Sequence, residues 1–142
     1  MKILIRFKII DFWYKREMRD NDLCSILVTD MAEYIFLRND DVWTLDKEFR
    51  FFFDAAIDHE IPVVHAVIPG KMDKELIRFL NRAKEKTPKL LDIVQHGWVH
   101  ANHSLDKRTK YEFGPSRSLK FQQEDIRQGL KQMRLAFGDH FT

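Results

Sequence analysis

The sequence predicts an α/β fold in which parallel strands alternate with helices. Three short apolar runs, at 34–37, 62–69 and 90–94, are bounded by prolines, glycine or charged residues, as buried strands are. Three longer segments follow these runs, and their apolar residues recur every three or four positions, which is the period of a helix packed on one side. Such alternation is typical of a parallel sheet with right-handed crossovers.

Composition excludes several classes of protein. The 142 residues, 44% of them hydrophobic, fit one domain over 1–142 with its own core. The formal charge of +2, from 24 basic and 22 acidic residues, argues against nucleic acid or an anionic membrane as partner. The lone Cys24 excludes an intramolecular disulfide, and no apolar run is long enough to span a membrane. Because Arg6 and Lys8 interrupt the apolar start and no small-residue cleavage site follows, we expect a cytoplasmic protein without a signal peptide.

Each predicted strand has its own pattern. Residues 2–14 alternate weakly and fit either a strand or an amphipathic helix, and Cys24–Val28 fits a strand or the end of a helix. Glu33–Arg38 is a clearer strand, with Asn39-Asp40-Asp41 at its carboxyl end. The run 62–69 is almost continuously apolar and β-branched, as in a parallel strand covered on both faces.

Three helices are predicted from their caps and apolar faces. The first begins after Thr44 or Asp46 and is ended by Pro62, which blocks helical continuation. The second begins after Asp73, and the third begins after Ser116 or Ser118 and is followed by Gly138 as its C′ residue. The expected apolar faces are Phe49, Phe52, Phe53, Ala56 and Ile57; then Leu76, Ile77, Phe79, Leu80 and Ala83; then Phe121, Ile126, Leu130, Met133 and Phe137.

The end of the chain suggests an exposed sheet edge. The long loop Ala101–Arg117 is expected to be functional or disordered. The chain stops at Thr142, where a further strand is expected, so the edge formed by 90–94 should be unpaired. Because unpaired edges are normally covered, a homo-oligomer through this edge is a candidate assembly.

Metal-capable side chains follow two of the predicted strands. Asp40 and Asp41 end one strand, and His96 and His100 follow the strand 90–94 at a spacing that lets both rings reach one ion. Carboxyl ends of parallel strands are where α/β folds place their chemistry, and imidazole is a favoured zinc ligand. The sequence therefore predicts a divalent-metal site, although surface or core histidines and turn or capping aspartates would give the same pattern.

The remaining polar and aromatic residues have less specific interpretations. His65, inside an apolar strand, is predicted to be a hydrogen-bonded core histidine, and His59 and His140 to be surface residues. Four residues are candidate substrate contacts, and each has a simpler alternative. Trp98 is predicted either to stack on a sugar or to pack in the core, and His103 either to contact substrate or the outside of the site or to be a solvated loop residue. Glu112 and Phe113, in Tyr111–Gly114, form either a flap over the substrate or an ordinary turn.

Taken in order, the segments Leu37–Asp41, Ile61–Pro69 and His96–His100 resemble the polysaccharide deacetylases, the NodB-like carbohydrate esterases of family 4. The resemblance covers about 33–141 and implies a partial (β/α) barrel. It implies a metal-dependent hydrolase of N-acetylated sugars in which Asp41, His96 and His100 hold the metal, zinc by preference, and Asp40 is the catalytic base.

The chain departs from the pattern of that family at three points. Val42 stands where the family has glycine, Gly97 stands where it has serine or threonine, and the family's later motifs are missing. Those motifs carry the arginine that orients the base and a histidine that acts as general acid. The sequence therefore suggests a truncated or degenerate deacetylase, with a non-catalytic metal-binding or interaction module as the alternative.

Overall fold

The computed structural model describes residues 2–8, 34–106 and 108–142. The run Cys24–Val28 lies outside these residues, as does the second half of 2–14. Within the described part the elements are β1 (Lys2–Lys8), β2 (Tyr34–Val42), α1 (Lys47–Asp58), β3 (Val63–Val67), α2 (Lys74–Lys86), β4 (Leu91–Gln95), α3 (Leu119–Phe137) and the short 3-10 helix η1 (Gly138–His140).

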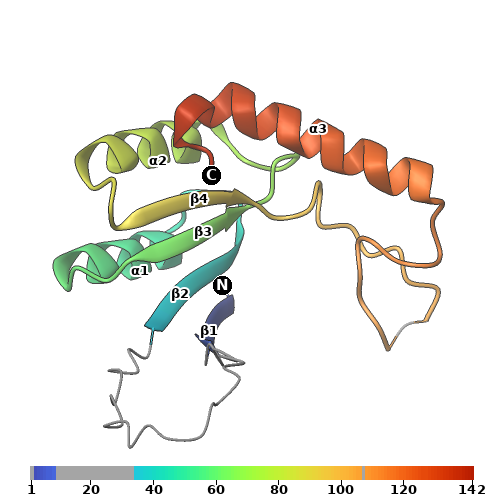
Figure 1. Cartoon of the computed structure of the whole chain (residues 1–142), viewed down its shortest axis with the longest axis horizontal. Coiled ribbons are helices and arrows are strands. Elements are labelled where there is room, and N and C mark those ends of the chain that lie inside the picture. Colours follow the sequence, from blue (N-terminus) through green and yellow to red (C-terminus); the bar gives the residue numbers. More distant parts are fainter. Residues whose placement is uncertain (1, 9–33, 107) are drawn as a thin grey trace, which may run out of the picture.

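The strands form one sheet in the order β1-β2-β3-β4. β2, β3 and β4 run parallel to one another, whereas β1 pairs antiparallel to β2. Strands and helices alternate from β2 to α3, which confirms a mixed α/β fold with a parallel sheet. In Figure 1 the carboxyl ends of β3 and β4 point the same way, and the loop that leads to α3 leaves from that end.

The three helices pack on one face of this sheet. The buried cluster joins Val67 of β3 and Leu91 and Ile93 of β4 to side chains from every helix, and these strand positions all point to the same face. The helical members are Phe49 and Phe53 of α1, Leu76 and Leu80 of α2, and Met133 and Phe137 of α3. Of the residues predicted to form the apolar faces of α1 and α2, these four are buried in the core.

Helix capping follows the side-chain chemistry of the sequence. The side chains of Asp46, Asp73 and Ser118 accept hydrogen bonds from the backbone N–H groups of the first turns of α1, α2 and α3. Thr44, the other candidate for α1, instead donates its hydroxyl to Asp73 at 2.7 Å. Partial burial alone would raise the pKa of Asp73, but hydrogen bonds from Leu76 and Thr44 outweigh it and lower that pKa.

Two helix predictions were wrong in detail. α1 ends at Asp58, and Glu60 then adopts a φ of 53°, so a turn ends the helix before Pro62 is reached. In α3, Phe121 and Ile126 are 64% and 48% exposed, not part of the apolar face. Only the C-terminal half of α3 is buried, through Gly129, Met133 and Phe137, because the N-terminal half extends past the sheet (Figure 1).

The outer edge of β4 is not wholly open as predicted. Phe141 forms an isolated parallel bridge with Ile93, and Thr142 N–H donates to the Ile93 carbonyl at 3.0 Å. Across the ranges given above, none of the helices has the length and apolar character needed to cross a bilayer.

Candidate metal centre

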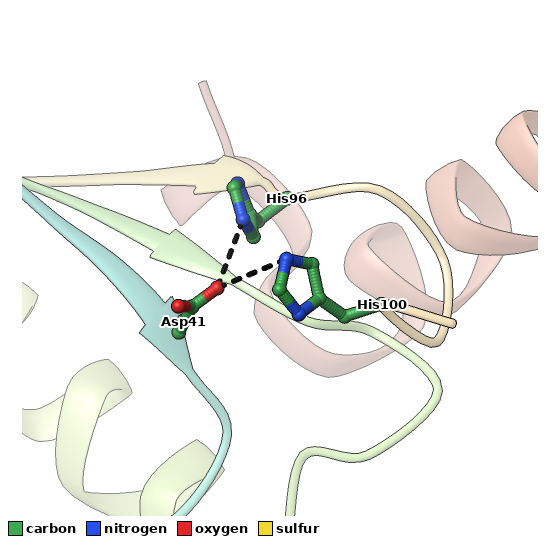
Figure 2. Close-up of side chains that lie close together, drawn as sticks. All are labelled: Asp41, His96 and His100. Carbon is green, nitrogen blue, oxygen red and sulfur yellow. Dashed lines mark ion pairs between the residues drawn. The ribbon is translucent and has the colours of Figure 1, made fainter. Parts of the chain in front are cut away.

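Two strands bring three metal-capable side chains together. Asp41 lies at the carboxyl end of β2, and His96 and His100 lie in the segment that leaves β4. Asp41 Oδ1 is 3.1 Å from His96 Nε2 and 3.3 Å from His100 Nε2, as Figure 2 shows. One ligand atom from each residue lies within 4.8 Å of the other two. The structure therefore confirms the predicted meeting of Asp41, His96 and His100 at one point.

The backbone of β2 is irregular where it supplies the acids. Asn39 pairs with His65 and Val42 pairs with Val67, so two residues of β2 stand between these pairs where β3 has one. Asp41 has a φ of 60°, a left-handed conformation that aspartate tolerates better than most residues. We expected Asn39-Asp40-Asp41 as the tip of this strand, and β2 does reach Val42; the bulge was not expected, and it turns both acids toward His96.

The three ligand atoms fit a bound cation better than they fit one another. Asp41 Oδ1 is buried and has no hydrogen-bond partner among the described residues, despite two imidazole nitrogens within ion-pair distance. The three atoms thus lie close together without hydrogen bonds between them. In a tetrahedral site with bonds of about 2.0–2.1 Å, neighbouring ligand atoms are roughly 3.3 Å apart. The Asp41–His96 and Asp41–His100 distances are close to this value.

Asp40 lies on the other side of His96 from Asp41. Its Oδ1 is 2.8 Å from Arg38 Nε and 3.8 Å from His96 Nδ1. Arg38 Nη2 also lies 3.3 Å from His96 Nδ1, so one guanidinium contacts both the acid and the imidazole. The resemblance led us to expect such an arginine only in a later motif. Arg38 was not among the site residues predicted from the sequence. The sequence did hold a signal for it: Arg38 and Asp40 are two apart on one strand, and such residues share a face.

Glu112 has a different place from the one predicted. It is buried, and its carboxylate accepts hydrogen bonds from three consecutive backbone N–H groups: Trp98 at 3.1 Å, Val99 at 2.7 Å and His100 at 2.9 Å. Its oxygens thus accept from the backbone of residues 98–100 and are not free to bind a substrate. A Cβ on Gly97 would lie 2.0 Å from Glu112 Oε2, which explains why glycine stands at this position.

The other predicted substrate contacts lie around the same segment. Trp98 is half-buried, and its carbonyl accepts a hydrogen bond from Gly70 N–H at 2.8 Å. Phe113 is half-buried next to Gly97. The backbone of His103 pairs with Tyr111 through its N–H at 2.9 Å, and Ser116 donates to its carbonyl, but His103 is not part of the ligand cluster.

The remaining histidines lie apart from the cluster. His65 is 1% exposed, lies 3.4 Å through Nδ1 from Asn39 Nδ2, and has its pKa lowered to about 4 by burial, as expected of a neutral core histidine. His59 is exposed, as predicted. His140, also predicted to lie at the surface, is half-buried, and its Nδ1 lies 3.0 Å from Asn81 Oδ1.

A small polar pocket adjoins the acids. Its volume is about 110 Å³, enough for water, and it lies on the α1 side of Asp41. It is lined by Asn39, Asp40, Asp41, Val42, Trp43, Thr44, Asp46 and Phe49. The side chains of His100, Asp41 and His96 are 45%, 26% and 22% exposed, so the centre can be reached from solvent.

Comparison of the chain with models of protein families, with characterised proteins and with solved structures gave no match.

Proposed function

We propose that Asp41, His96 and His100 bind one divalent metal ion, with zinc the best-suited metal, and that the centre hydrolyses the N-acetyl amide of a sugar. The observation that carries the proposal is the convergence of Asp41 Oδ1 with two Nε2 atoms at 3.1 and 3.3 Å. Two imidazoles and one carboxylate form a ligand set of the kind found in hydrolytic zinc sites, which keep a position open. When bound, the metal would acidify water and polarise the substrate carbonyl.

The residues around this centre have distinct roles in the proposal. Asp40 accepts the proton of the attacking water, because it is the carboxylate beside the ligand cluster that is not itself a ligand. Arg38 attracts Asp40 as an ion pair, with Nε 2.8 Å from Asp40 Oδ1, although neither atom has a hydrogen-bond partner among the described residues. The partly exposed side chains of Asp41, His96 and His100 leave the centre open to water. Asp40 Oδ1 lies 3.8 Å from His96 Nδ1, so the proposed base stands next to a proposed ligand.

Two features of the fold support the resemblance to polysaccharide deacetylases. The ligands lie at the carboxyl ends of parallel strands, where β/α barrels place their active sites. The three helices in the described part of the chain also pack on one and the same face of the sheet, as the outer helices of such a barrel do. We therefore propose that the sheet corresponds to part of a barrel of the deacetylase type.

A second candidate is a metal-binding or interaction module without turnover. It is favoured by two departures from the family's pattern within the ligand-bearing segments: Val42 in place of glycine, and Gly97 in place of serine or threonine. Both candidates predict the same bound metal, so turnover separates them.

Metal binding is tested first, by titrating the chelator-treated chain with Zn²⁺ or Co²⁺ and measuring the bound metal. We expect one ion per chain in the wild type. Removal of an outer-shell group typically costs about 10–100-fold in metal affinity, so Asp41→Ala and His100→Ala, which remove ligands, should cost more. His59→Ala, at an exposed histidine outside the cluster, is the matched control. A wild-type chain without affinity, or an equal loss in the control, would refute the metal centre.

Hydrolysis is tested next, by measuring acetate release from acetylated chitooligosaccharides with the zinc-loaded chain. Slow release that depends on zinc, with Asp40→Asn keeping the metal but losing turnover about 10²-fold or more, would support the deacetylase. Stoichiometric metal with no acetate release from this or other N-acetyl sugars would favour the non-catalytic module.

A further inference from the structure

The segment between β4 and the loop 101–117 has an unusual backbone. Gly97 and His100 both have positive φ values, of 63° and 53°, and a residue with a side chain seldom adopts this conformation unless its surroundings enforce it. Between them, the N–H groups of Trp98, Val99 and His100 all point at one carboxylate. Consecutive backbone N–H groups that converge in this way form an anion-binding concavity, and here the anion is Glu112.

Glu112 alone, among the described residues, binds the amide of the second histidine. Gln95 Nε2 donates to the Gly97 carbonyl at 2.8 Å, and Gly70 N–H donates to the Trp98 carbonyl at 2.8 Å, so these bonds fix the beginning of the segment. The His100 N–H, in contrast, donates to Glu112 Oε1 at 2.9 Å. The direction of the His100 ring toward Asp41 therefore depends on a residue from the far end of the next loop.

Residues 97–100 pack tightly against Glu112 on one side and against α3 on the other. A Cβ at Gly97 would fall 2.0 Å from Glu112 Oε2 and 3.1 Å from its carboxyl carbon. Gly129 of α3 closes the other side, since a Cβ there would lie 2.1 Å from Gln95 Nε2 and 3.0 Å from the Gly97 carbonyl oxygen. The segment 97–100 is thus held between α3 and Glu112, with room only for glycine at both contact points.

We propose that Glu112 is a positioning residue for the metal centre. Its carboxylate fixes the backbone of 98–100 and so aims His100 Nε2 at Asp41, without touching metal or substrate itself. The inference rests on the proposed metal centre for its function. It also links the loop 101–117 to the site, because the same carboxylate anchors the end of that loop to the segment that carries the ligand.

The test uses Glu112→Gln, which keeps the shape of the side chain but replaces one acceptor oxygen with a donor. Such an amide cannot accept from all three N–H groups. Two quantities are measured on the full chain: hydrogen exchange of the amides of 98–100 without metal, and affinity for Co²⁺ followed by its absorption spectrum. Glu124→Gln is the matched control, because Glu124 is exposed on α3.

We expect faster amide exchange at 98–100 in Glu112→Gln, with exchange in β3 unchanged, and about 10–100-fold weaker Co²⁺ binding, as is usual when an outer-shell partner is lost. The control should match the wild type in both. Unchanged exchange would overturn the proposal, and so would faster exchange with unchanged affinity. If the wild type binds no metal, the proposed function and the positioning role both fail, while exchange still decides whether Glu112 holds the segment. If Glu112→Gln does not fold, Glu112→Asp, which keeps the charge but draws the carboxylate back by one methylene group, replaces it in both measurements.

Discussion

His65 should make the stability of this protein depend on pH. It is 1% exposed, and its ring centroid lies 5.2 Å from that of Phe49 and 5.8 Å from that of Phe53. Its one hydrogen-bond partner in the described part of the chain is Asn39 Nδ2, a donor, so Nδ1 accepts and the ring is neutral. Burial among these rings disfavours the imidazolium and lowers the pKa of His65 to about 4.

The size of the effect follows from linkage. The unfolded chain has the ordinary histidine pKa of 6.5 and the folded chain about 4, a difference that corresponds to roughly 3 kcal/mol of unfolding free energy. The contribution of His65 to the free energy of unfolding is fully present above about pH 6.5. It falls as the pH drops toward 4, because the unfolded state binds a proton that the folded state excludes. Below that value both states are protonated, and this contribution does not change further.

The assay is urea unfolding at about pH 7 and about pH 4.5 with a chelator present, for wild type and His65→Gln. The variant keeps a polar group beside Asn39 but has no titrating ring. We expect the wild type to lose roughly 2 kcal/mol more than the variant between these pH values, since most of the titration lies in that window. Equal losses would refute the reasoning, and so would a His65 ring resonance in NMR that titrates near pH 6.5 in the folded protein.

Two further predictions concern the neighbourhood of the metal centre. Gly97→Ala should destabilise the chain by more than the roughly 1–3 kcal/mol of a strained backbone, because its Cβ also meets Glu112 Oε2 at 2.0 Å. Gly138→Ala, at a φ of 52° with nothing within 4 Å of its Cβ, is the control that carries only the backbone cost, and similar melting temperatures for the two variants would contradict the clash. Arg38→Lys should leave metal stoichiometry unchanged but lower acetate release about tenfold or more, since lysine cannot contact Asp40 and His96 together as the planar guanidinium does. A loss of metal without a specific loss of turnover would show that Arg38 supports the ligands and not the base.

The caps and the strand–helix alternation could be predicted because they depend on local chemistry. Asp46, Asp73 and Ser118 each cap a helix since a short side-chain oxygen reaches the first-turn N–H groups from that position alone. The meeting of the end of β2 with the segment after β4 followed from the rule that parallel strands end at the same edge, whereas the choice of Asp41 over Asp40 as the ligand came from the resemblance.

What the sequence could not predict depends on contacts between distant segments. Phe121 fits the apolar period of α3, but the sheet does not extend far enough to cover it. Glu112 lies in a loop without periodicity, and nothing local indicates that its partners are the amides of 98–100. The bulge in β2 was not predicted, because it breaks the alternation on which strand prediction relies.

The bulge in β2 changes the directions in which two neighbouring acidic side chains point. In a regular pleat, consecutive residues face opposite sides, so one of two neighbouring acids would point toward the aromatic rings of α1. Because two residues of β2 occupy the space of one between the pairs Asn39–His65 and Val42–Val67, consecutive acids instead approach the two nitrogens of a single imidazole. Deleting either aspartate would thus remove more than a carboxylate: it would restore the pleat and turn the survivor away from His96. The length of this stretch is as much a part of the centre as its acidity.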